Sequence, residues 1–378
     1  MGFATDCIHA GQEPDPTTGA VITPIYQTST YVQEGIDQHK GYEYARTHNP
    51  TRRALERNLA ALEGGTDAYC YASGMAATNA VLSFVKAGQR VVVSDNVYGG
   101  THRLFTKILA QYGVEFAFIE ASDAAAFDAQ AGRFDLLWTE TPTNPLMKVC
   151  DIAALAAVAR KRDALMVVDN TFMSPFFQRP LALGADIVVH STTKFLNGHS
   201  DSVGGVAVVR CEAHAKWLQY VQNAAGAILS PFDSWLVLRG TKTLALRMPR
   251  HEENAAVVAR FLREEAKVLK VNWPGFADHP GHEVQRRQAT GYGALISFDL
   301  GSREGADRML RAVRLCSLGE SLGGVETLIS HPATMTHAGY TQAERDALGI
   351  GNGLVRLSVG CEDADDLVAD LRRGIAAI

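Results

Sequence analysis

Short apolar runs alternate with helical patterns along most of the chain, starting at about residue 50. Continuous apolar runs of this length are typical of strands that are buried on both faces of a parallel sheet. The predicted strands are residues 90–94, 116–119, 136–139, 165–168, 186–189 and 205–209. The predicted helices are residues 51–63, 101–112 and 151–162, with a further helix that begins near Ser73. Strands that alternate with helices predict an α/β fold with a mostly parallel central sheet covered on both faces.

The two ends of the chain have different patterns. The first residues are rich in Thr, Gly, Pro and Tyr and show little periodicity, which predicts an extended arm that another surface orders. A helical stretch over 241–267, a strand over 294–300 and a closing helix from Asp363 predict a smaller α+β unit. We therefore expect an N-terminal arm (1–48), a large domain (49–240) and a small C-terminal domain (241–378).

Composition and charge exclude several classes of protein. The 378 residues are 47% hydrophobic and 20% charged, so the chain can bury a large core. The formal net charge of −5 favours neither nucleic acid nor an anionic membrane as a partner. No apolar run is long enough to span a bilayer and the start lacks signal-peptide features, which predicts a cytoplasmic protein. The six cysteines are scattered without a Cys-x-x-Cys pair, so we expect neither a disulfide framework nor a metal site.

Two of the predicted strands lead into groups of opposite charge. The strand over 165–168 runs into Asp169, and the strand over 186–189 leads through a hydroxyl-rich turn to Lys194. Taken alone, the lysine reads as a solvated charge and the aspartate as a turn cap. Together they suit pyridoxal phosphate, because the amine forms a Schiff base with its aldehyde and the carboxylate keeps its ring nitrogen protonated.

Residues around this pair supply what a phosphate and an aromatic ring require. Ser191 and Thr193 offer hydroxyl groups beside the lysine. Gly74 and Met75 stand at the start of a predicted helix, where backbone N–H groups are unpaired and attract anions. Tyr98 follows a predicted strand and is suited either to stacking on the ring or to ordinary packing.

The motifs formed by these residues resemble those of a known family. The chain resembles the Cys/Met-metabolism enzymes that depend on pyridoxal phosphate, which have the fold type I (aspartate aminotransferase-like) architecture. The similarity extends from Gly-Ala-Val-Ile-Thr-Pro-Ile-Tyr at 19–26 to Arg-Leu-Ser-Val-Gly at 356–360. It is strongest in Asp-Asn-Thr-Phe at 169–172, Pro-Leu-Ala-Leu-Gly-Ala-Asp at 180–186 and the segment 191–199 that contains the lysine.

The resemblance implies a role for each matching residue. It assigns the Schiff base to Lys194, the ring nitrogen to Asp169, and both ring stacking and a catalytic role to Tyr98. Asn144 would contact the ring oxygen and the substrate carboxylate. The residues implied to hold the phosphate are Gly74, Met75, Ser191 and Thr193, together with Tyr44 and Arg46 reaching from a neighbouring subunit. That last contribution implies a homotetramer built from two dimers.

Further residues are implied to bind an amino-acid substrate. Arg356 would grip the α-carboxylate with its two-pronged guanidinium, whereas the alternative from sequence alone is a surface salt bridge. Ser321 and Thr336 would position Lys194 and Arg356. Glu320 at the pocket mouth would bind the distal ammonium group of cystathionine, and Arg103 would bind its distal carboxylate.

Within the family, the chain resembles the cystathionine γ-lyases most. Glu320 resembles the glutamate of γ-lyases and γ-synthases, whereas β-lyases carry an aromatic residue there. Gly100 stands where methionine γ-lyases carry a cysteine. The implied reaction is γ-elimination on L-cystathionine, giving cysteine, 2-oxobutanoate and ammonia, with hydrogen sulfide release from cysteine as a side activity. Lys194 would move the protons, and Tyr98 would protonate the leaving sulfur.

Three alternatives stand beside this hypothesis. A cystathionine γ-synthase would instead join cysteine to O-succinylhomoserine or O-acetylhomoserine. A nicotinamide dehydrogenase would need a Gly-x-Gly-x-x-Gly turn after a strand, and the sequence has none. A catalytically silent cofactor-binding scaffold is disfavoured by the joint presence of Lys194, Asp169 and Arg356.

Overall fold

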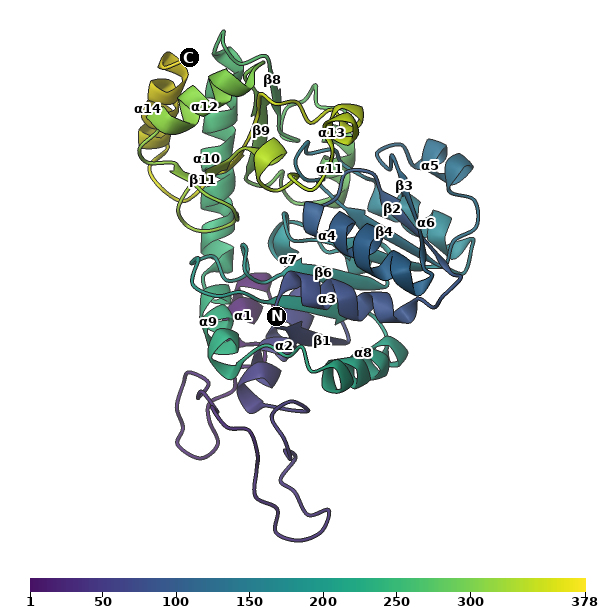
Figure 1. The fold of residues 1–378 in the computed structure, drawn as a ribbon. Helices are drawn as coiled ribbons and strands as arrows, with labels where there is room; N and C mark the ends of the chain where they lie inside the picture. Colours follow the sequence, from purple (N-terminus) through teal and green to yellow (C-terminus); the bar gives the residue numbers. More distant parts are fainter.

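A seven-stranded sheet forms the centre of the computed structural model, which describes residues 1–378 (Figure 1). The strand order is β1-β7-β6-β5-β4-β2-β3. Strand β7 pairs antiparallel with both of its neighbours and the other strands run parallel, so the predicted mostly parallel sheet is confirmed. The strand bounds are β1 (Asp67–Tyr71), β2 (Arg90–Ser94), β3 (Glu115–Ile119), β4 (Leu136–Glu140), β5 (Leu165–Asp169), β6 (Ile187–Ser191) and β7 (Gly205–Val209). The first of them, β1, was not predicted.

Helices cover both faces of this sheet, which explains why its strands are apolar throughout. Val91 and Val93 of β2 pack in one core with helices α3 (Gly74–Val81) and α8 (Glu212–Ala225). Val92 points the other way, into a second core with α5 (Ala124–Ala131) and α6 (Ile152–Arg160). Successive side chains of a strand alternate between faces, so a strand that is covered on both sides carries no polar stripe.

Local capping signals place several of the predicted helices. Helix α2 (Pro50–Glu63) begins where the Asn49 side chain accepts hydrogen bonds from the first turn, and it ends at Gly64 with a φ of 74°. Ser73 caps α3 by accepting from Ala76 N, and Asp151 caps α6 by accepting from Ala154 N. A side-chain oxygen at this position satisfies an otherwise unpaired N–H group.

The predicted helix over 101–112 differs from the structure. Helix α4 (Gly99–Arg103) begins two residues earlier. The helical segment then continues as a π-helical turn (Leu104–Ile108) and a 3₁₀ turn (Leu109–Tyr112). The two glycines at its start look like a turn in the sequence. Gly99 is nevertheless required in the helix, because a Cβ there would lie 2.1 Å from the carbonyl oxygen of Thr336.

A second sheet lies at the far end of the long helix α10 (Leu244–Glu264) (Figure 1). Its order is β10-β11-β12-β9-β8, with bounds β8 (Lys270–Asn272), β9 (Leu295–Asp299), β10 (Ser317–Leu318), β11 (Leu328–Ser330) and β12 (Leu354–Ser358). The predicted helix over 241–267 is therefore α10, preceded by a separate helix, α9 (Pro231–Thr241). The closing helix is α14 (Ala364–Ala376), with Asp363 at its N-terminal boundary, as predicted.

The N-terminal segment is only partly an extended arm. Helix α1 (Phe3–His9) buries Cys7 completely, and Asn58 of α2 donates hydrogen bonds to the carbonyls of Asp6 and Ala10. A helix of seven residues is too short to show a recognisable apolar stripe in the sequence. The chain between α1 and α2 contains no further helix and projects away from the rest of the subunit (Figure 1).

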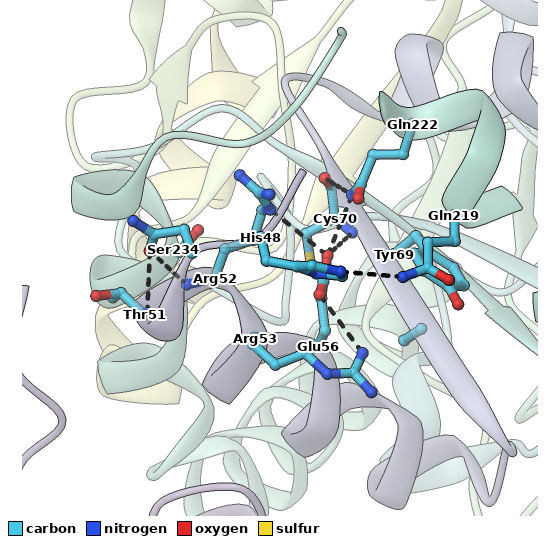
Figure 2. A network of polar contacts seen from close by, with 12 residues as sticks. His48, Thr51, Arg52, Arg53, Glu56, Tyr69, Cys70, Gln219, Gln222 and Ser234 are labelled. Atoms are coloured by element: carbon cyan, nitrogen blue, oxygen red, sulfur yellow. Dashed lines mark hydrogen bonds and ion pairs between the residues drawn. The ribbon is translucent and has the colours of Figure 1, made fainter. Parts of the chain in front are cut away.

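A buried polar network anchors the end of this projecting segment (Figure 2). Glu56 of α2 accepts a hydrogen bond from Gln222 of α8 at 3.1 Å. On the same helix, Arg52 is 1% exposed and donates to the carbonyls of Ala45 and Arg46 at 2.9 and 3.1 Å. The backbone before α2 is therefore held against α2, which is itself bonded to α8.

No helix of the chain is both long and apolar enough to cross a membrane.

Candidate active site

One cavity lies between the carboxyl ends of the large sheet's strands and the smaller sheet. Its volume of about 320 Å³ falls within the range of small-molecule sites. In doubly wound folds, ligands bind at this edge of the sheet. The predicted residues that line it are Gly74, Met75, Tyr98, Asn144, Asp169, Ser191, Thr193, Lys194, Glu320, Ser321, Thr336 and Arg356.

Lys194 stands in the turn that follows β6. Its Nζ donates a hydrogen bond to Ser321 Oγ at 2.6 Å. Burial lowers the pKa of Lys194 to about 8, and the charge of Arg356 acts in the same direction while Glu320 opposes it. An amine with a lowered pKa is more readily deprotonated, as both a nucleophile and a proton acceptor require.

Two carboxyl groups lie side by side at the ends of β4 and β5. Glu140 and Asp169 are partners in the parallel register. Burial raises the pKa of Glu140 well above its usual range, and the neighbouring Asp169 adds to that effect. Burial also raises the pKa of Asp169, but hydrogen bonds from Thr171 and the charge of His190 oppose the rise. Of the two carboxyl groups, Asp169 is therefore the better suited to remain ionised.

Glu140 was missed by the sequence analysis, although a signal was present. It directly follows the predicted strand over 136–139, just as Asp169 follows the next strand. Its Oε1 accepts a hydrogen bond from the backbone N–H of Tyr98 at 2.8 Å. Glu140 therefore holds the backbone of Tyr98 in place and, with it, the starting point of the tyrosine side chain.

Tyr98 lies at the start of α4, with its ring against Gly100. A Cβ at Gly100 would come within 2.4 Å of Tyr98 Cε1 and 3.1 Å of Met75 Sδ. Burial raises the pKa of Tyr98, as does the charge of Glu320, while Arg103 and Arg356 lower it. The hydroxyl group is therefore protonated at neutral pH and can donate a proton.

Hydroxyl groups and a helix N-terminus converge at another part of the cavity. Gly74 is the first residue of α3, and a Cβ there would lie 2.9 Å from Ser191 Cβ. The start of α3 is therefore in close contact with the end of β6, where the turn to Lys194 begins. Thr193 Oγ1 accepts from Gly204 N at 3.0 Å, which holds the turn together. The unpaired N–H groups of the first helical turn, with these hydroxyl groups, form a set of donors suited to a phosphate.

Arg356 of β12 is 2% exposed and has no carboxylate partner, so the alternative of a surface salt bridge is wrong. Its Nη1 donates to Asn144 Oδ1 at 3.0 Å and its Nη2 donates to Ser321 O at 2.9 Å. Burial lowers the pKa of Arg356 to about 10. A buried cation without a counter-ion is costly, so the site favours an anionic ligand.

Ser321 has an unusual backbone conformation at this point. Its φ is 101°, which is rare for a residue with a side chain. The strained backbone directs its hydroxyl group to Lys194 and its carbonyl group to Arg356. Such strain is concentrated at functional sites.

Three predicted residues lie outside the cavity lining. Arg103 is exposed on α4, although its charge influences Tyr98. Tyr44 and Arg46 lie in the projecting segment, where the Arg46 guanidinium is 5.4 Å from the Tyr44 ring centroid and donates to Asn223 of α8. Neither residue reaches the cavity of its own chain.

The fold and the cavity together define a pyridoxal-phosphate-dependent enzyme of fold type I. An amine with a lowered pKa, a carboxylate at a strand end and a set of phosphate donors fit this cofactor. The chain belongs to the Cys/Met metabolism PLP-dependent enzyme family, whose model matches residues 4–376. The cofactor of this family is pyridoxal 5′-phosphate.

Relatives with different activities are about equally similar to the chain. A cystathionine γ-lyase of Bacillus subtilis is 48% identical, with 100% of both chains covered. A cystathionine β-lyase of Coxiella burnetii is 49% identical, with 98% of this chain and 97% of the relative covered. A solved cystathionine γ-lyase from Lactobacillus plantarum, in complex with L-serine, has a TM-score of 0.97 at 45% identity, with 100% and 99% covered. The comparisons therefore establish sulfur amino-acid chemistry but leave the particular reaction open.

Proposed function

We propose that this protein is a cystathionine γ-lyase that cleaves L-cystathionine, with the uptake of water, to cysteine, 2-oxobutanoate and ammonia. The observation that carries the proposal is Glu320, an exposed carboxylate at the edge of the same cavity as Lys194 and Arg356. Glu320 forms no ion pair within the chain, which contrasts with Glu120 and Glu283 on the surface. It is therefore available to an ammonium group at the far end of an extended substrate.

The proposed roles of the chain's residues follow from their positions. Arg356 binds the α-carboxylate with two parallel hydrogen bonds, and Asn144 holds the guanidinium in place. Lys194 removes the α-proton, would pass it to the bound cofactor and, as the neutral amine again, removes a β-proton. Tyr98 protonates the leaving sulfur. When bound, the cofactor supplies the electron sink that makes these carbon-bound protons acidic.

The decisive assay compares two reactions in the purified, cofactor-loaded enzyme. We expect cleavage of L-cystathionine to be faster than the condensation of cysteine with O-succinylhomoserine. Faster condensation would instead identify a γ-synthase, and the absence of both reactions would identify a silent cofactor-binding protein. Glu320→Gln is expected to weaken cystathionine cleavage about 10- to 100-fold, since a hydrogen bond to a charged group contributes about 1.5–3 kcal/mol.

The lowered pKa of Lys194 predicts how cofactor capture depends on pH. Only the neutral amine attacks the cofactor aldehyde, so the capture rate of the apoenzyme should rise with pH and level off above about 8. Because Glu320 raises this pKa, Glu320→Gln should move the midpoint to lower pH. Stopped-flow absorption of the lysine-bound cofactor measures both midpoints, and an unchanged midpoint in the variant would contradict the proposed electrostatics.

The contact between Tyr98 and Gly100 predicts that a side chain at position 100 impairs catalysis. In Gly100→Cys the new Cβ displaces the Tyr98 ring, and kcat/KM for cystathionine should fall about 100-fold, the cost of a misplacement of about 1 Å. Steady-state kinetics measures the effect. Gly351→Ala is the matched control because a Cβ there meets nothing within 4 Å.

We further propose that Tyr44 and Arg46 complete the phosphate site of a neighbouring subunit in a homotetramer of two dimers. Large apolar side chains of the projecting segment support this, since Val32 and Ile36 are 91% and 93% exposed. A single subunit leaves them in water, and a second subunit would bury them.

Mixing inactive variants tests this exchange between subunits. Arg46→Ala and Lys194→Ala subunits, refolded together, should regain about a quarter of the wild-type activity, because half of the random dimers each keep one complete site. Lys194→Ala mixed with Asp169→Asn should regain none, because both changes affect a subunit's own site. Failure of the first mixture to recover would show that Arg46 does not serve a neighbour.

A further inference from the structure

A buried arginine contacts the turn that carries Lys194. Arg247 of α10 is 6% exposed and does not line the cavity. Burial lowers the pKa of Arg247 to about 10, so the guanidinium group is still charged at neutral pH. A charge is costly to bury unless it is well hydrogen-bonded. The hydrogen bonds that compensate for this cost therefore indicate what the side chain holds in place.

The guanidinium group donates its hydrogen bonds to uncharged oxygens, two of which belong to the lysine turn. Nη1 donates to the carbonyl of Phe195 at 2.8 Å, and Nη2 makes a longer contact of 3.5 Å with the carbonyl of Leu196. Nη2 also donates to Gly240 O at 3.0 Å, and Nε donates to Thr243 Oγ1 at 3.1 Å. Because Phe195 directly follows Lys194, the arginine holds the backbone next to the lysine.

The lysine turn is in close contact with both the guanidinium group and the loop that contains Ser321. A Cβ at Gly198 would lie 2.2 Å from Nη1 of the arginine, and a Cβ at Gly323 would lie 2.6 Å from Phe195 N. The turn therefore has no free space at either contact. Because Lys194 Nζ bonds to Ser321, a shift of the turn changes the position of the amine in the cavity.

Helix α10 is itself anchored further along the face that carries the arginine. His251 bonds to the carbonyl of Val359 at 2.7 Å, and Asn254 donates to the carbonyl of Gly360 at 3.0 Å. These carbonyls follow β12, the strand that contains Arg356. Residues spaced by four and then three positions lie on one face of a helix. The helix that holds the lysine turn is therefore bonded to the chain that follows the strand of Arg356.

We propose that Arg247 is a positioning residue for Lys194, which holds the lysine turn by the Phe195 carbonyl so that Nζ can reach the cofactor aldehyde and accept a proton. Correct placement of a reacting group contributes strongly to its rate. The inference rests on the proposed role of Lys194. It adds a residue outside the cavity that fixes the geometry on which that role depends.

The test compares a cofactor that reacts with Lys194 and a close analogue that does not. Pyridoxal 5′-phosphate condenses with the lysine amine and loses water, whereas pyridoxamine 5′-phosphate has an amine in place of the aldehyde and cannot. In Arg247→Met, the rate at which the apoenzyme captures the aldehyde should fall about 100-fold, the cost of a misplacement of about 1 Å. The dissociation constant of the pyridoxamine phosphate should stay that of wild type, because Thr171 and Gly204 hold the hydroxyl-bearing residues of the phosphate site.

Steady-state kinetics gives a second readout, with the sulfur substrate that the wild-type enzyme converts fastest. Arg247→Met should lower kcat per bound cofactor and leave KM unchanged, because Arg356 keeps its own contacts. Arg247→Lys should recover part of the lost capture rate and kcat, since an ammonium group can bond to the Phe195 carbonyl but cannot make all the contacts of a guanidinium group. Arg260→Met should behave as wild type, because Arg260 is exposed on the same helix.

The possible outcomes separate the inference from the role of Lys194. If wild-type protein forms no lysine-bound cofactor, the proposed role of Lys194 is wrong. If Arg247→Met weakens pyridoxamine phosphate as much as it slows capture, the arginine is merely structural and the inference fails. Capture as fast as in Arg260→Met would also overturn it.

A milder variant covers the case in which Arg247→Met folds poorly. Thr243→Val keeps the arginine and removes the hydroxyl group that accepts from its Nε. Capture of the aldehyde should slow about tenfold, the loss expected for one hydrogen bond of a charged group, with the affinity for pyridoxamine phosphate unchanged. A capture rate equal to that of wild type would contradict the positioning role.

Discussion

Replacing Lys194 with alanine should eliminate the lysine-bound form of the cofactor and lower kcat by about 1,000-fold or more, since both nucleophilic and proton-transfer catalysis are lost. The physical reason is the position of Nζ, which is partly buried in the cavity, hydrogen-bonded to Ser321 and easily deprotonated. The visible absorption band of the lysine-bound cofactor and the rate of keto-acid release measure the two effects.

The matched control for this variant is a lysine on the surface. Lys161 follows α6 and its side chain is 67% exposed. Lys161→Ala should keep both the absorption band and the turnover of wild type. Retention of the band in purified, cofactor-supplemented Lys194→Ala would show that a different lysine carries the cofactor.

Arg356→Lys should raise the KM for cystathionine about 10- to 100-fold, because a hydrogen bond to a charged group contributes about 1.5–3 kcal/mol. Lysine retains the charge but cannot make two parallel hydrogen bonds to a carboxylate. It also cannot reach both Asn144 and Ser321, so kcat should fall as well. Steady-state kinetics separates the two effects.

Discrimination between cystathionine and an analogue without the α-carboxylate shows whether Arg356 binds that group. The wild-type enzyme should discriminate strongly against a cystathionine analogue that lacks the α-carboxylate, and Arg356→Lys should lose most of that discrimination. Arg263→Lys, in which the original arginine pairs with Asp278 on the surface, should behave as wild type. Full discrimination in Arg356→Lys would mean that the carboxylate binds elsewhere.

Much of the fold and most of the cavity could be predicted because they depend on periodic patterns. Buried parallel strands such as β5 and β6 are short apolar runs, and ligand groups lie at or just beyond their carboxyl ends, as Asp169 and Lys194 do. Those two residues are 25 apart in the sequence, yet they line one cavity because their strands are neighbours.

Other features depend on contacts that no local pattern encodes. The sequence places Glu140 at the end of a strand, but its position beside Asp169 follows from the register of β4 and β5, and strand order cannot be derived from the strands themselves. Gly99 is helical because the distant Thr336 backbone leaves no space for a side chain. The contact between Arg247 and Phe195 joins residues 52 positions apart. Each of these requires the packed structure.

The most direct measurement of the proposed function is the identity of the keto acid released from L-cystathionine by the cofactor-loaded enzyme. Mass spectrometry distinguishes the two possible cleavages of this substrate. We expect 2-oxobutanoate with cysteine, the products of breaking the bond between sulfur and the γ-carbon. Pyruvate with homocysteine would show β-elimination and would contradict the assignment made from Glu320.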